Sequence, residues 1–169
     1  MRRSTPRATR SAIPAIAYGL ATRYGGIETG PGKRALPDST AVDPVSVVLE
    51  TLRDGCVGES VAAEIAREAS RCAREPEVAE ALAGIAADEQ AHAELAWRTV
   101  AWLAVEHGAP VHDAIRRFSA GLADTSDETV DGVDLSAHGA LGVRAQLAVR
   151  RAVLRDVVRP CLDGLLGRQ

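Results

Sequence analysis

The chain has 169 residues, of which 46% are hydrophobic and 25% charged, and this composition is typical of one ordinary folded domain with an apolar core. Disorder over the whole chain is therefore excluded. Aromatic residues make up only 3%, so the hydrophobic fraction rests on Ala, Val and Leu, which suit closely packed helices better than strands. The formal net charge of −3 gives no global field that would recruit nucleic acid or an anionic membrane. We expect an all-α protein.

Residues 1–42 combine a short helix with a linker. The pattern predicts a helix from about Ser11 to Tyr24, which a pair of glycines then ends. The following segment, up to Pro44, is rich in Gly, Pro, Ser and Asp, as linkers and surface loops are. The N-terminal stretch is rich in Arg and has a short apolar segment that resembles a targeting signal, but Pro14 and the missing cleavage site argue against one. We expect a cytoplasmic location, with a targeting segment as the alternative.

Residues 43–107 are predicted to form a long antiparallel helical hairpin. Its first helix begins at Asp43-Pro44, with Asp as the N-cap and Pro at the first helical position, and continues to about Ala73. Its second helix follows a break at residues 74–76 and runs to Glu106, where His107-Gly108 ends it. Only a few residues separate the two helices, so they are neighbours that run in opposite directions.

Residues 108–169 are expected to add further helices to the same bundle. The pattern predicts a short helix from about Val111 to Leu122, an acidic loop over residues 123–134 and a last helix from about Ser136 to Leu166. No apolar run reaches the length of about 18 residues that a bilayer span requires. The three cysteines show no C-x-x-C spacing, so neither a disulfide framework nor a thiolate zinc site is indicated.

Three polar residues interrupt the apolar stripes of the hairpin. Alternating steps of four and three along the first helix place Glu59 between Cys56 and Ala63 on one stripe. The same steps along the second helix place Glu89 and His92 in consecutive stripe positions. The turn at residues 74–76 puts Glu59 level with His92, and an i, i+3 step of about 4.5 Å keeps Glu89 on the same face. We therefore expect the three side chains to converge.

This convergence indicates a metal site. Carboxylates that lie together away from water are unfavourable unless a proton or a cation compensates them. Carboxylate oxygens with one imidazole nitrogen suit iron or manganese, with zinc as a further option, and a Glu-x-x-His step that faces a Glu on another helix is half of a dinuclear carboxylate site. Asp88 lies beside Glu89 but off the stripe, where it is placed to accept a hydrogen bond from a ligand imidazole, including one of a partner subunit. A chance E-x-x-H pattern on a Glu-rich helix is the alternative.

The segments Glu59–Ala63 and Ile85–Trp97 resemble the ferritin-like di-iron superfamily, in particular the D-E-x-x-H helix of rubrerythrin-type proteins. The similarity covers about residues 43–107. It implies a ferritin-like helical bundle in which Glu59 and Glu89 are carboxylate ligands of iron, His92 is the nitrogen ligand and Asp88 is an outer partner of the site. It also implies oxygen or peroxide chemistry, such as ferroxidation.

The chain carries only half of the ligands that such a di-iron site needs. A complete single-chain site requires a second Glu and a second Glu-x-x-His, and the predicted last helix contains no Glu. Encapsulated ferritins, which also hold one such hairpin per chain, complete the centre across a two-fold dimer, and isologous pairing would supply each ligand twice here. We therefore expect a homodimer. A short similarity between residues 13–18 and 92–97 suggests instead that the N-terminal segment is the remnant of a first hairpin without its ligands.

Two further functions stay open from the sequence. The first is a non-enzymatic helical interaction module with a degenerate, metal-free site and a partner surface on residues 111–122. The second is a nucleic-acid module that uses the Arg-rich stripe of the last helix, which the acidic net charge disfavours.

Overall fold

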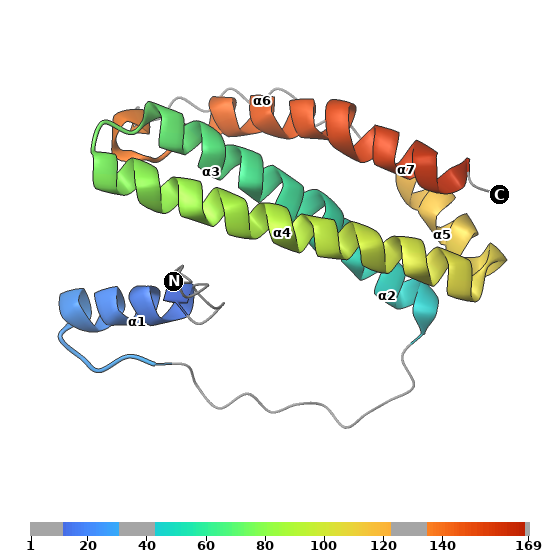
Figure 1. Ribbon diagram of the computed structural model, residues 1–169, viewed down its shortest axis with the longest axis horizontal. Helices are drawn as coiled ribbons and strands as arrows, with labels where there is room; N and C mark the ends of the chain where they lie inside the picture. The colour runs from blue at the N-terminus through green and yellow to red at the C-terminus, as the bar shows by residue number, and fades with distance from the viewer. Residues whose placement is uncertain (1–11, 31–42, 123–134, 168–169) are drawn as a thin grey trace, which may run out of the picture. The chain divides into compact units, whose positions relative to one another are not determined.

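The computed structural model describes residues 12–30, 43–122 and 135–167, and within these ranges all regular elements are helices (Figure 1). One isolated bridge joins Leu135 to Ala140. The predicted all-α class is confirmed, while the predicted acidic loop at residues 123–134 lies outside the described residues. None of the described helices is long and apolar enough to cross a membrane.

The chain divides into two units, Met1–Thr40 and Ala41–Gln169. The first unit contains helix α1, which spans Ala12–Gly25 and so ends one residue later than predicted. Gly26 follows it with a φ of 67°, and its N–H donates to the carbonyl of Thr22. Glycine adopts this left-handed conformation at little steric cost, which explains why the helix stops at the glycine pair.

The first helix of the hairpin is continuous but not uniform. It consists of α2 (Pro44–Glu50), a π-helical segment η1 (Thr51–Glu59) and α3 (Ser60–Cys72). Asp43 caps its start as predicted, because its carboxylate accepts hydrogen bonds from the N–H groups of Val45 and Ser46 at 3.3 and 3.0 Å. The π-helical segment was not predicted, since a search for 3.6-residue periodicity does not detect i→i+5 hydrogen bonding.

The second helix, α4 (Pro76–His107), runs antiparallel to the first, as predicted (Figure 1). Gly108 ends α4 with a φ of 59°. The predicted register is also confirmed, because Gly55 of η1 faces Ala96 of α4: a Cβ built on Gly55 would lie 2.6 Å from the Cβ of Ala96. These two positions are one turn away from Glu59 and His92.

Helix α5 (Ala109–Ala120) contacts α2, α4 and α7 at one end of the hairpin. The last helix combines α6 (Val143–Val153), a second π-helical segment η3 (Leu154–Val158) and α7 (Arg159–Leu166). It lies along the first helix of the hairpin, with α6 against α3 and η3 against η1 (Figure 1). The first helix of the hairpin therefore contacts α4 and the last helix, and its α2 segment also contacts α5.

The predicted start of the last helix at Ser136 is wrong. Residues Ser136–His138 form a short 3₁₀ turn, η2, and the helix begins only at Val143. Gly139 has a φ of 84°, and a Cβ on it would lie 2.8 Å from side-chain atoms of both Leu82 and Val78. This glycine lets the loop pack closely against α4, where a continuing helix would not fit.

The core lies where the hairpin, α5 and the last helix meet. Its fully buried side chains come from every one of these elements: Val48, Leu52, Cys56, Val100, Val111, Ala114, Ile115, Val158 and Leu162. On α4 the buried positions are Ala86, Ala93, Ala96, Val100, Leu103 and Ala104. This stripe is rotated slightly from the predicted one, so Glu89 and His92 lie at the edge of the core and not inside it.

Candidate metal centre

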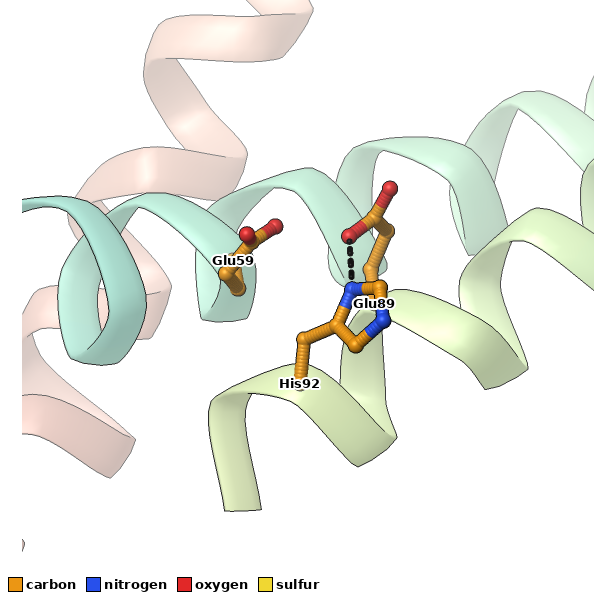
Figure 2. Close-up of side chains that lie close together, drawn as sticks. All are labelled: Glu59, Glu89 and His92. Carbon is orange, nitrogen blue, oxygen red and sulfur yellow. Dashed lines mark hydrogen bonds and ion pairs between the residues drawn. The ribbon is translucent and has the colours of Figure 1, made fainter. Parts of the chain in front are cut away.

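Two elements bring the three predicted ligands together. Glu59 is the last residue of η1, and Glu89 and His92 lie one turn apart on α4 (Figure 2). One possible ligand atom from each side chain lies within 4.8 Å of the other two. Among the described residues, this is the one group of at least three His, Cys, Asp or Glu that meets this criterion. The predicted convergence is therefore confirmed.

The site is half-exposed. The side chains of His92 and Glu89 are 34% and 24% exposed, and Glu59 is also partly buried. Nδ1 of His92 lies 3.1 Å from a carboxylate oxygen of Glu89, drawn as the dashed line in Figure 2. With the proton on Nδ1, this nitrogen donates to Glu89 and the lone pair of Nε2 is free to bind a metal. A metal ion can thus reach the group from solvent without opening the core.

The pKa values of the two carboxyl groups are shifted in opposite directions. The pKa of Glu59 is raised from its ordinary value of 4.5 to about 7, mainly by its hydrogen bond with Glu89 and then by burial and the negative charge of Glu89. The pKa of Glu89 is lowered by the same hydrogen bond, while burial opposes this shift and His92 adds to it. Glu59 is therefore the proton donor of the pair and Glu89 the acceptor. A divalent cation would take the place of this proton.

Asp88 has a different position. Its side chain is exposed on α4, and the imidazole of His92 bonds to Glu89 and not to Asp88. Its predicted role toward an imidazole of a partner subunit stays a prediction. The last helix packs on α3. It has no Glu or His among its described residues, so it contributes no ligand of these two types.

Three protein ligands suffice for one ion whose remaining coordination positions are filled by solvent. A dinuclear carboxylate centre needs about twice as many. The described residues therefore offer one set of three ligands, and the predicted half of a dinuclear centre stays a prediction.

The sequence reasoning missed two features beside the ligands. The first is the close contact of Gly55 with Ala96. The second is an exposed apolar face on α4, formed by Leu95, Trp102 and Val105, which are 52%, 58% and 85% exposed. Steps of seven and three residues place these side chains on one side of the helix, and only Leu95 lies within one turn of His92. The seven-residue step from Leu95 to Trp102 was visible in the sequence. These two residues lie beside the stripe that the prediction used, and not on it.

Comparisons with protein-family models, with curated proteins and with solved structures found no match to this chain. The geometry of the three side chains therefore carries the functional argument.

Proposed function

We propose that the chain binds a divalent transition-metal ion, iron in the first place and manganese or zinc as alternatives, through Glu59, Glu89 and His92. The observation that carries this proposal is the convergence of two carboxylates and one imidazole from two helices, with possible ligand atoms within 4.8 Å of one another. Two carboxylates and one imidazole are a donor set that suits iron or manganese. The charge also fits, because a cation relieves the repulsion that otherwise keeps a proton on Glu59.

We further propose that a homodimer completes a dinuclear centre of the ferritin-like type. The exposed face of Leu95, Trp102 and Val105 begins one turn after His92 on α4, and a surface that gathers large apolar side chains is typical of a protein–protein interface. A two-fold contact through this face of α4 would bring two copies of the Glu59, Glu89 and His92 group toward one another. Both the unused apolar face and the incomplete ligand set are then explained by one assembly.

The residues of the chain have separate roles in this proposal. Glu59 and Glu89 supply negative charge, and metal binding displaces the proton that they share. Nδ1 of His92 lies 3.1 Å from a carboxylate oxygen of Glu89, so these two side chains would hold the ion together. A bound pair of ferrous ions would supply oxygen or peroxide chemistry, such as ferroxidation.

An anaerobic Fe²⁺ titration of the full chain tests the proposal, with the mass in solution measured on the same sample. Two irons per dimer are expected. Glu89→Ala should abolish stoichiometric binding, whereas Glu80→Ala, which removes an exposed carboxylate from the same helix, should leave it unchanged. Unchanged binding in Glu89→Ala would overturn the assignment of the ligands.

The second candidate is an interaction module without a functional metal, and the exposed apolar face of α4 is the observation that favours it. The surface predicted for this role was residues 111–122, but α5 turns Val111, Ala114 and Ile115 into the core. A wild-type protein that binds no iron and stays monomeric would favour this second function over the first.

A further inference from the structure

The backbones of η1 and α4 approach one another closely at Gly55 and Ala96. A Cβ built on Gly55 would lie 2.6 Å from the Cβ and 3.9 Å from the Cα of Ala96. Carbon atoms in good contact are about 3.5–4.0 Å apart, so only glycine fits at position 55 while α4 stays where it is. Ala96 is 7% exposed, and its methyl group has no free space to turn into because it is fixed to the backbone. The contact therefore sets the separation of the two helices at this level.

This level is one turn from the proposed metal site. Gly55 precedes Glu59 by four residues in one helix, and Ala96 follows His92 by four residues in the antiparallel helix. A helix is stiff over one turn, and closely packed interiors transmit small displacements instead of absorbing them. A change in separation at Gly55 and Ala96 is thus passed on to Glu59 and His92.

The site has little tolerance for such a change. Two ligand atoms on opposite sides of one ion are at most about 4 Å apart, because each metal–ligand bond is about 2.0–2.2 Å long. The ligand atoms here lie within 4.8 Å of one another, so an added separation of about 1 Å would carry the group beyond the reach of one ion. A methyl group on Gly55 would push α4 away by about 1 Å, which is the difference between the built distance and an ordinary carbon contact.

We infer that Gly55 is a positioning residue of the proposed metal site: its contact with Ala96 holds Glu59 and His92 close enough to bind one ion. The inference rests on the proposed function, since it concerns the same three ligands. It also gives a reason for a glycine within a helix, where glycine is otherwise unfavourable.

Three variants of the full chain test this inference. Gly55→Ala adds the methyl group to one side of the contact. Gly58→Ala is the matched control in the same π-helical segment, because a Cβ there would meet only the carbonyl oxygen of Arg53, at an ordinary 3.5 Å. The double variant Gly55→Ala with Ala96→Gly moves the methyl group across the contact and restores its volume. Affinity is measured by anaerobic Fe²⁺ titration, and ligand geometry by the visible absorption of the Co²⁺-loaded proteins.

Gly55→Ala should bind Fe²⁺ at least tenfold more weakly and with an altered Co²⁺ spectrum, as groups that orient metal ligands are commonly worth about 10–100-fold in affinity. Gly58→Ala should keep the wild-type affinity within about twofold, and the double variant should recover most of the loss. Wild-type affinity in Gly55→Ala would overturn the inference, even if that variant were less stable. If Gly55→Ala did not fold, the double variant would decide, because weak binding by a folded double variant contradicts a role that depends on the contact alone.

Crystal structures of the metal-free wild type and of Gly55→Ala test this inference separately from the proposed function. The inference expects a larger separation of Glu59 from His92 in the variant, and an unchanged separation would overturn it. Absence of metal binding in the wild type would overturn the proposed function, while the measured separation would still decide the inference.

Discussion

Glu59→Gln should make the metal-free protein more stable at alkaline pH. In the wild type, the pKa of Glu59 is raised from an ordinary 4.5 to about 7, chiefly through its hydrogen bond with Glu89. The folded state therefore binds more protons than the unfolded state between about pH 4.5 and pH 7, and the free energy of unfolding falls as the pH rises through this range. Glutamine keeps the shape of protonated Glu59 and can donate the same hydrogen bond to Glu89, but it cannot ionise.

The size of this effect follows from the shift in the pKa. Moving the pKa from 4.5 to about 7 corresponds to at most about 3.5 kcal/mol, at about 1.4 kcal/mol for each unit. Solvent screens the pair, because the neighbouring Glu89 and His92 side chains are 24% and 34% exposed, and this reduces the expected difference to about 1 kcal/mol. We expect the unfolding free energy of Glu59→Gln, relative to that of the wild type, to rise between about pH 4.5 and pH 7 and to exceed it by about 1 kcal/mol at pH 8.

Urea denaturation in the presence of a chelator, from pH 5.5 to pH 8.5, measures this difference. The control is Glu80→Gln, an exposed position on α4, which should follow the wild type at every pH. Anaerobic Fe²⁺ should reverse the order of stability, because ligand at 100 times its dissociation constant adds about 2.7 kcal/mol to a protein that binds it and nothing to one that does not. A Glu59→Gln protein that is less stable than the wild type at pH 8 without metal would refute the shared proton.

Two further predictions concern the dimer and the start of the hairpin. Trp102→Asp places a charge on the exposed face of α4 and should convert the proposed dimer into a monomer in sedimentation experiments, with the helical circular dichroism unchanged; a dimer that persists would exclude this face as the interface. Asp43→Ala removes the carboxylate that accepts from the N–H groups of Val45 and Ser46, and should lower the free energy of unfolding by about 1 kcal/mol, whereas Asp43→Asn should retain most of it.

Most helix boundaries could be predicted because the signals that set them are local. Asp43-Pro44 begins a helix through a cap formed by its own carboxylate, and Gly108 ends α4 because a left-handed conformation is needed there. The last helix is different, since its true start at Val143 depends on the close packing of Gly139 on Leu82 and Val78, residues that lie far away in the sequence. A local pattern cannot contain that contact.

The identity of the three candidate ligands was likewise determined by the sequence. The period of a helix decides which residues share a face, and the position of the turn decides which residues of two antiparallel helices are level. Glu59, Glu89 and His92 could therefore be brought together without a structure, and they do lie within reach of one ion.

Tertiary structure alone decided how far these residues are buried and how closely their helices approach. Periodicity leaves open the rotation of a helix about its axis, and the rotation of α4 follows from its packing against α3 and η1. That rotation leaves His92 at the edge of the core, with the exposed Leu95 one turn away. The separation of the helices depends on two small residues, Gly55 and Ala96, whose contact exists only after the hairpin has closed.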